Sequence, residues 1–234
     1  FAQDIVLMHS VGIRPVVVHG GAPQIGGMLD RLGMKSQFVD GLRVTDSDTL
    51  DIARMVLVGK VNRDIVSSIN IHGPLAVGIS GEDAGLITAK SHSKELGFVG
   101  EVQDVNPSLI EGLLKEGHIP VISSIGADGN GQSYNINADT VASSLATALK
   151  AKRIIYLTDI EGLRADMENP ESHISKITTS NLKEMIESGT ISGGMIPKAK
   201  ACLEAIDAGV ANLISVSLSI DFFRIIKLIA KLSF

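Results

Sequence analysis

Short apolar runs and amphipathic stretches alternate along this chain. Phe1, Ile5 and Met8 recur at the spacing of one helical face, and Gly12 ends this first predicted helix. Four apolar runs rich in Val and Ile predict buried strands at residues 16–18, 75–79, 119–122 and 153–157. The amphipathic stretches predict helices at residues 49–71, 107–116, 140–151 and 181–187. This alternation is typical of parallel strands with helices on both faces, so we expect a three-layer α/β/α sandwich with a mainly parallel central sheet.

Two parts of the chain depart from this alternation. Shorter alternating segments at residues 38–44, 98–102 and 133–136 predict hairpins at one end of the sheet. Near the C-terminus, apolar residues at 222, 225, 226 and 229 and basic residues at 224, 227 and 231 predict a basic amphipathic helix. Three interpretations of that segment stay open: an ordinary packed terminal helix, a helix that binds a membrane surface or a partner, and a disrupted terminus.

Composition narrows the classes of protein to which the chain can belong. Its 234 residues, 44% of them hydrophobic and 20% charged, suffice for one large domain or two lobes with a buried core. Lys and Arg number 21 against 26 Asp and Glu, and the net charge of −5 argues against a nucleic-acid binder. The single cysteine, Cys202, cannot form an internal disulfide and indicates a reducing compartment, the cytoplasm. The apolar runs are shorter than the ~20 residues that a membrane-spanning helix needs.

Five segments near the ends of predicted strands carry glycine or polar residues that could bind an anionic ligand. They are residues 18–23, 40–46, 134–139, 157–163 and 192–198. Gly20 and Gly21 form a turn between a strand and a helix, where backbone N–H groups can approach an anion; a plain tight turn is the alternative. Arg43, in a glycine-flanked ribbon, could hold a carboxylate or simply form a surface salt bridge.

The remaining segments offer side chains of both signs. Asn135, Asn137 and Asp139 step from a strand onto a helix, and helix capping accounts for one of the three. Lys198 follows a Gly-Gly turn and could contact a phosphate or face solvent. The sequence lacks a Walker A loop, a G-x-G-x-x-G fingerprint, metal-spaced histidines and a G-x-S-x-G elbow. The five segments therefore favour an anion-binding site, although the sequence lacks the usual signatures of nucleotide-binding proteins and hydrolases.

Taken in order, the motifs resemble the amino-acid kinase family, and above all its members that phosphorylate N-acetyl-L-glutamate. The matching segments are HGGAPQI (19–25), DGLRVTD (40–46), MVLVGKVNRDIV (55–66), AVGISGEDAGL (76–86), LGFVGEV (96–102), IPVISSIG (119–126), YNINADTVA (134–142), LTDIEGL (157–163) and GGMIPK (193–198). The resemblance covers residues 1 to about 213. It implies the amino-acid kinase fold, with an N-acetylglutamate-binding lobe over residues 1–152 and a nucleotide-binding lobe over residues 153–234.

The resemblance also implies an activity: ATP-dependent phosphorylation of the side-chain carboxylate of N-acetyl-L-glutamate, the second step of arginine biosynthesis. That carboxylate is already ionised, so catalysis requires alignment and positive charge rather than a general base. Mg²⁺ would arrive with ATP, and the protein would need no metal site of its own. The partners that the resemblance implies are N-acetyl-L-glutamate, ATP, further copies of the chain in a homo-oligomer and a nitrogen-control signalling protein.

Each site residue takes a role from the resemblance. Gly20, Gly21 and Ala22 would contact the substrate through their backbone. Arg43 would hold the substrate α-carboxylate, and Asn135 would bind beside it. Lys198 would neutralise the transferring phosphoryl group, and Asp139 would orient this lysine. The nucleotide would contact Asp159, Ile160, Glu161, Gly162, Leu163, Arg164, Thr190, Ile191 and Ser192.

Three departures from the family pattern qualify the resemblance. The family's first strand, which ends in a Lys-x-Gly-Gly turn, would precede residue 1; Ala22 stands where a third glycine is usual; and residues 214–234 do not match. We therefore expect a fold that lacks its first strand and has an atypical C-terminus. We also expect this chain to be a poor catalyst. Two alternatives stay open: another kinase of the family, or a non-catalytic nucleotide-binding or scaffold subunit.

Overall fold

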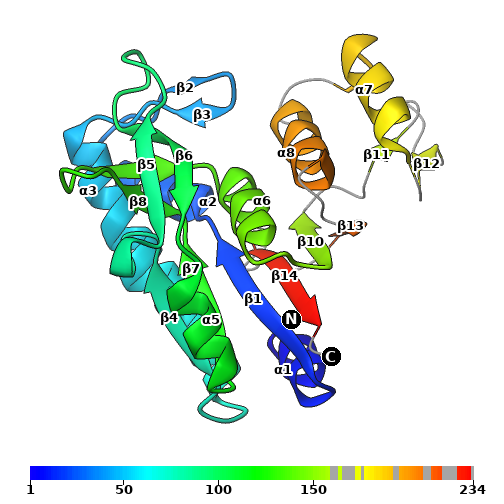
Figure 1. Cartoon of the computed structure of the whole chain (residues 1–234). Coiled ribbons are helices and arrows are strands. Elements are labelled where there is room, and N and C mark those ends of the chain that lie inside the picture. Colours follow the sequence, from blue (N-terminus) through cyan, green and yellow to red (C-terminus); the bar gives the residue numbers. More distant parts are fainter. Residues whose placement is uncertain are drawn as a thin grey trace.

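A six-stranded sheet forms the centre of the protein (Figure 1). The computed structural model describes residues 1–158, 163–164, 172–174, 177–191, 195–207, 212–217 and 226–232. In spatial order the strands are β13 (Asn212–Ser217), β10 (Arg153–Thr158), β14 (Ile226–Leu232), β1 (Ile13–His19), β7 (Ile119–Ser123) and β4 (Ala76–Ser80).

Most pairs in this sheet are parallel. β7 runs parallel to both β1 and β4, and β10 runs parallel to β13. Ser123 at the end of β7 is in register with His19 of β1 and with Ser80 of β4. The carboxyl ends of these three strands therefore meet at one edge of the sheet, the edge at which open α/β proteins bind ligands.

Helices cover both faces of the sheet, and alternate residues of β1 divide between two apolar cores. Val16 and Val18 belong to the core that also contains residues of α5 (Ser108–Lys115) and α6 (Ala138–Ala148). Val17 belongs to the core that contains residues of α1 (Ala2–Ser10) and α2 (Ala22–Arg31). All three valines are 0% exposed, as expected of a strand buried on both faces. The predicted three-layer sandwich is confirmed.

The helix predicted at residues 49–71 is longer and less regular than its pattern suggests. It consists of α3 (Ser47–Arg54), a seven-residue π-helix η1 (Met55–Val61) and α4 (Asn62–Asn70). The Asp46 side chain caps α3 by accepting a hydrogen bond from the Thr49 N–H (2.8 Å). Val56, Leu57 and Val61 of the π-helix are buried against the sheet. The π turns thus keep an apolar face on this core within an otherwise α-helical segment.

The predicted hairpins lie at the ligand-binding edge. β2 (Phe38–Val39) and β3 (Leu42–Arg43) pair across a two-residue turn, Asp40-Gly41, in which both residues have positive φ (50° and 80°). The other two predicted segments correspond to β6 (Val99–Val105) and β9 (Ser133–Ile136). They form a small closed barrel with two strands that the pattern does not predict, β5 (Ile87–Ser91) and β8 (Ile125–Ala127). A short 3₁₀ turn, η2 (Asp83–Gly85), leads from β4 into the barrel.

The described segments after β10 include a second group of elements. α7 (Thr179–Glu187) and α8 (Met195–Asp207) pack through a third apolar core that contains Leu182, Ile191, Ala199 and Leu203. Two short strands, β11 (Leu163–Arg164) and β12 (His173–Ile174), pair with each other, and α8 contacts α6. Among the described residues, no helix is long and apolar enough to span a bilayer.

The predicted C-terminal amphipathic helix is wrong. Residues 226–232 form β14, which lies between β1 and β10 and runs antiparallel to both; residues 218–225 lie outside the described residues. Ile229 is in register with Val16 on one side and Ile154 on the other. A strand with two paired edges forms backbone hydrogen bonds on both, and a segment rich in Ile and Leu suits such a strand. Tertiary pairing thus overrides the helical spacing of the apolar residues.

Candidate functional site

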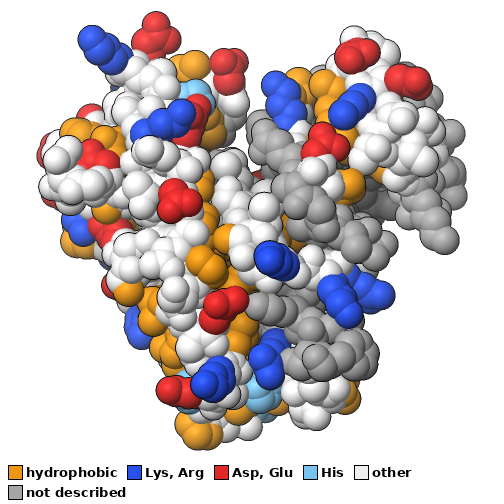
Figure 2. Space-filling model, in the orientation of Figure 1, with side chains coloured by type: hydrophobic (Ala, Val, Ile, Leu, Met, Phe, Trp, Pro, Cys, Tyr) orange, Lys and Arg blue, Asp and Glu red, His pale blue; other side chains and the backbone are white. Residues whose placement is uncertain are grey.

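A cavity of about 220 Å³ lies at the carboxyl edge of the sheet. Four parts of the fold line it: the turn after β1, the β2–β3 hairpin, β9, and the start of α6. Leu57 of the π-helix and Val99 of β6 add apolar wall. Figure 2 shows Lys and Arg interspersed with Asp and Glu over the described surface of the face drawn, rather than gathered in one patch. The cavity is large enough for a small molecule, and its lining combines apolar side chains with polar groups, as expected of a binding site for a small polar ligand.

The turn after β1 brings backbone to the cavity. Gly21 is the N-cap of α2, Pro23 lies in the first turn, and the Gly21 carbonyl accepts the first helical hydrogen bond from Ile25 (2.8 Å). A Cβ atom at Gly21 would lie 2.6 Å from Cδ2 of Leu57, so a side chain here would force the Leu57 side chain of the π-helix to shift. The N-terminus of α2, with its positive dipole end, is therefore held against the cavity wall.

Arg43 supplies a buried cation. It is 8% exposed, although it stands on a two-residue strand. One guanidinium nitrogen, Nη2, donates to the Ala22 carbonyl (2.9 Å), Nη1 donates to Ser36 Oγ, and the guanidinium lies 4.7 Å from the centre of the Phe38 ring. Burial lowers the pKa of Arg43, with the Asp30 charge acting against that shift, but an arginine stays protonated at any physiological pH. These contacts hold the cation in place beside the glycine turn.

The three polar residues between β9 and α6 all line the cavity, and one of them also caps α6. Asn137 caps α6, because its Oδ1 accepts from the N–H groups of Asp139 (2.8 Å) and Thr140 (3.3 Å). Asn135 lines the cavity, and its Nδ2 donates to Thr45 Oγ1 at 3.4 Å. Asp139, 8% exposed, also lines the cavity from the first turn of α6. The site therefore combines two helix N-termini, one arginine, two side-chain amides and one carboxylate, an arrangement suited to an anion with an adjacent cation.

A buried polar pair supports the turn from beneath. The ring of His19 contacts the Gly20 carbonyl through Nδ1 (3.0 Å) and the side-chain amide of Asn62 through Nε2 (3.0 Å). Both residues are 0% exposed. Burial, with a smaller contribution from Arg63, lowers the pKa of His19 to about 4 against the raising effect of its bond to Gly20. His19 is therefore neutral near pH 7.

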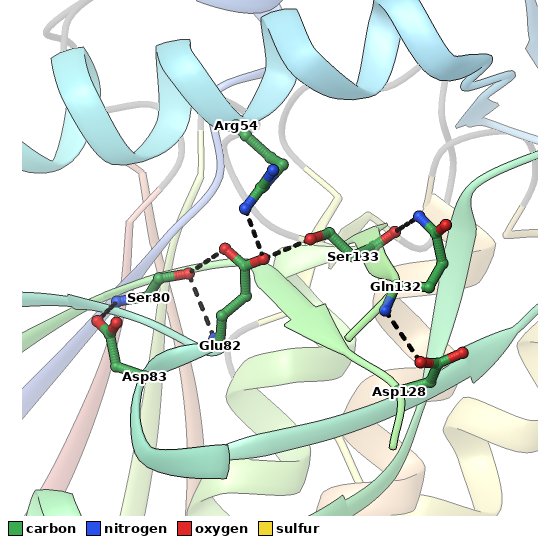
Figure 3. Close-up of polar contacts among 7 residues, drawn as sticks. All are labelled: Arg54, Ser80, Glu82, Asp83, Asp128, Gln132 and Ser133. Atoms are coloured by element: carbon green, nitrogen blue, oxygen red, sulfur yellow. Dashed lines mark hydrogen bonds and ion pairs between the residues drawn. The ribbon is translucent and has the colours of Figure 1, made fainter. Parts of the chain in front are cut away.

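A second polar cluster connects β9, which forms one wall of the cavity, to the end of α3 (Figure 3). Glu82 follows β4 and lies between Arg54, at the end of α3, and Ser133, on β9. Its Oε1 accepts from Arg54 Nη2 (3.0 Å) and from Ser133 Oγ, and its Oε2 accepts from Ser80 Oγ (3.4 Å). Ser133 lies two residues before Asn135 on the same face of β9. Glu82 thus ties the wall that bears Asn135 to the helix that begins just after Arg43.

Comparison with known proteins places this site in a family. The sequence profile described as the amino acid kinase family matches residues 1–216. The chain belongs to the amino acid kinase family. Family members named acetylglutamate kinase include one from Desulforamulus reducens, 54% identical over 213 residues that cover 89% of this chain and 74% of that protein. One from Methanocaldococcus jannaschii is 50% identical over 224 residues, with coverages of 91% and 75%.

A solved structure supports the same family fold. The crystal structure of smu.665 from Streptococcus mutans UA159 has a TM-score of 0.84 to this chain at 28% identity, and the match covers 94% of this chain and 89% of that one. The predicted amino-acid kinase fold is therefore confirmed.

The structure brings all five residues predicted to bind the substrate together with Asp139, which is predicted to be catalytic. Gly20, Gly21, Ala22, Arg43, Asn135 and Asp139 line one cavity. Of the predicted nucleotide residues, Thr190 and Ile191 follow α7, and Ile191 is buried in the core between α7 and α8. Residues 159–162 (Asp159, Ile160, Glu161 and Gly162) and Ser192 lie outside the described residues; of Leu163, Arg164 and Lys198 only the backbone is described, in β11 and α8.

Sequence reasoning missed several residues of the site and its support. Phe38 and Leu57 line the cavity but read as ordinary apolar positions. Asn62 carried a signal, because it shares the helical face of the buried Ile65 and Ile69 and is polar. A polar side chain on an apolar face has to find partners inside the fold.

Proposed function

We propose that this chain transfers the γ-phosphoryl group of ATP to the side-chain carboxylate of N-acetyl-L-glutamate. Relatives that are half identical and named acetylglutamate kinase support this activity. The structural observation that carries it is the convergence of Arg43, Asn135, Asp139 and the Gly20-Gly21 turn on one cavity. A cation, an amide and two helix N-termini form a receptor for an anionic, amide-bearing small molecule.

The reaction requires little proton chemistry. A carboxylate oxygen of the substrate attacks the γ-phosphorus, the bond from that phosphorus to the β–γ bridging oxygen breaks, and ADP leaves with the electron pair. The products are an acyl phosphate and ADP. Because the nucleophile is already an anion, the obstacle is its repulsion from the polyphosphate, and the protein has to supply alignment and positive charge.

On the substrate side, each group has a defined part in the proposal. Arg43 pairs with the α-carboxylate, and its bonds to Ser36 and Ala22 keep it aimed at the cavity. Asn135 donates from β9 beside it. Backbone N–H groups of Gly21 and Ala22, at the positive end of α2, face the reacting carboxylate and the transferring phosphoryl group.

The nucleotide side of the proposal uses the lobe over residues 153–234. Lys198 neutralises the transferring phosphoryl group, and Asp139, at the start of α6, orients that lysine. α8, which carries Lys198, contacts α6, which carries Asp139. Residues 159–164 and 190–192 hold the nucleotide, and Mg²⁺ enters bound to its phosphates as part of the substrate.

Calorimetric titration with N-acetyl-L-glutamate tests the proposal, with free L-glutamate as the comparison ligand. We expect N-acetyl-L-glutamate to bind more tightly than free glutamate, and the Arg43→Ala variant to bind at least tenfold more weakly, since a hydrogen-bonded charge contributes about 1.5–3 kcal/mol. Asp64→Asn, which alters an exposed ion pair with Lys60, is the matched control and should bind as the wild type does. Trapping the acyl phosphate with hydroxylamine in the presence of ATP identifies the product. Absence of binding at millimolar N-acetyl-L-glutamate, or a clear preference for free glutamate, would reject the assignment.

A further inference from the structure

We propose that His19 and Asn62 are positioning residues that fix the Gly20–Gly21 peptide so that the Gly21 N–H points into the cavity. The inference deepens the proposed function and rests on it, because the ligand that this N–H would meet is the substrate anion. It assigns a role to two side chains that do not line the cavity themselves.

The contacts of Asn62 determine which of its atoms is which. Its Nδ2 lies 2.9 Å from the Val121 carbonyl and 3.4 Å from the Ile79 carbonyl, and both of these groups can only accept. The atom there must therefore be the amide nitrogen, and it donates. The same nitrogen lies 3.0 Å from Nε2 of His19, so Nε2 accepts.

The tautomer of His19 follows. With Nε2 as acceptor in a neutral ring, the proton is on Nδ1, which lies 3.0 Å from the Gly20 carbonyl and donates to it. A single tautomer thus satisfies every polar contact of the ring. The depressed pKa of His19 is consistent with this, because the protonated ring would carry a second N–H against the Asn62 amide.

The geometry of the peptide unit then sets the direction of the Gly21 N–H. In a trans peptide, the carbonyl and the following N–H point in opposite directions, and the described residues contain only trans peptides. The Gly20 carbonyl is drawn to the buried His19 ring, so the Gly21 N–H points to the opposite side, where Gly20 and Gly21 line the cavity. A peptide unit between two glycines has more conformational freedom than one between other residues. It therefore needs a hydrogen bond from outside the turn if its N–H is to keep one orientation.

Asn62 is itself held by the fold. It begins α4 directly after the π-helix, and it bridges β1, β4 and β7 at the edge where their carboxyl ends meet. A Cβ atom on Gly78 would collide with Asn62 Oδ1 and with the guanidinium of Arg63, so the strand leaves this space to these two side chains. The His19–Asn62 pair therefore joins the central sheet to the Gly20–Gly21 peptide.

Two substitutions of His19 separate positioning from simple core packing. The side-chain nitrogen of asparagine is as far along the chain as Nδ1 of histidine, whereas that of glutamine reaches the position of Nε2. His19→Asn therefore keeps the donor to Gly20, and His19→Gln loses it; both remove the ring. We expect His19→Asn to bind N-acetyl-L-glutamate within about threefold of the wild type, and His19→Gln to bind at least tenfold more weakly, at similar unfolding free energies.

Nitrogen-15 NMR of the imidazole gives a readout that packing alone would not move. In the wild type we expect the Nδ1–H tautomer, and a downfield shift of the Gly21 amide proton when N-acetyl-L-glutamate is added. An Nε2–H tautomer, an unresponsive Gly21 amide, or equal losses of affinity in the two variants would overturn the proposal. If neither variant folds, the two wild-type NMR measurements decide it. If the wild type does not bind N-acetyl-L-glutamate, the proposed function fails, and titration of the Gly21 amide with inorganic phosphate still tests the positioning role.

Discussion

The buried imidazole of His19 makes the fold sensitive to acid. Its pKa is lowered from 6.5 to about 4 in the folded protein, chiefly by burial. As the pH falls, the His19 imidazole is therefore protonated near pH 6.5 in the unfolded chain but only near pH 4 in the folded chain. The contribution of His19 to stability is complete above pH 6.5 and is lost as the pH falls from 6.5 to 4. A shift of this size corresponds to about 3 kcal/mol, a large fraction of the 5–15 kcal/mol that typically stabilises a domain.

Urea denaturation followed by circular dichroism at pH 7 and pH 4 measures this loss. The wild type should lose about 3 kcal/mol more unfolding free energy between the two conditions than His19→Asn, which has no group to titrate there. Carboxylates whose pKa values are lowered by hydrogen bonds, such as Asp46, affect both proteins equally. His72→Asn, which removes an exposed histidine, should behave as the wild type. Equal acid losses in wild type and His19→Asn, or an NMR titration of His19 near pH 6.5 in the folded protein, would refute the reasoning.

Three further perturbations test other parts of the structure. Arg43→Lys should weaken N-acetyl-L-glutamate binding about tenfold or more in calorimetry, because a lysine ammonium cannot make the several contacts of the planar arginine guanidinium. An unchanged affinity would contradict the proposed role of Arg43 in binding the α-carboxylate. Glu82→Ala should lower the free energy of unfolding measured in urea by about 1–2 kcal/mol, because Ser133 loses its hydrogen-bond acceptor. The control Asp64→Ala, on the exposed helix surface, should lower it by only a few tenths of a kcal/mol. Equal losses in the two variants would contradict a stabilising role of Glu82. Ile229→Pro should lower stability by about 3 kcal/mol or more, because proline removes an N–H from a strand paired on both edges, and an unchanged melting temperature would contradict the place of β14.

The sequence predicts the sandwich and part of the cavity for related physical reasons. A buried parallel strand needs apolar residues on both faces, and Val16, Val17 and Val18 meet that need. Parallel strands bring their carboxyl ends to one edge, so the glycine turn after β1 falls next to residues that are distant in the chain. The polar character of Arg43 and Asn135 then identifies them as candidates for the cavity that they line.

Other features depend on contacts that local spacing does not record. Residues 226–232 have a helical apolar spacing, and only the open edges of β1 and β10 make them a strand. The π-helix at Met55–Val61 reads as ordinary helix, because its sequence contains no proline and no change of period, and the single Gly59 does not by itself distinguish a π turn from an α turn. The cavity-lining role of Phe38 depends on a two-residue turn that folds the hairpin back, and the partners of Asn62 come from three different strands.

The position of β14 has a consequence for how the molecule assembles. In the described part of the sheet, β1, β7 and β4 form one half, β10 and β13 form the other, and β14 is the strand that joins them. Among the described residues, β14 pairs with every residue of β1 on that side, and without this pairing the β1 edge would expose unpaired backbone N–H and C=O groups, which invite pairing with other chains. The cohesion of the central sheet therefore depends on how firmly one late strand of the chain docks between two halves that do not pair with each other among the described strands.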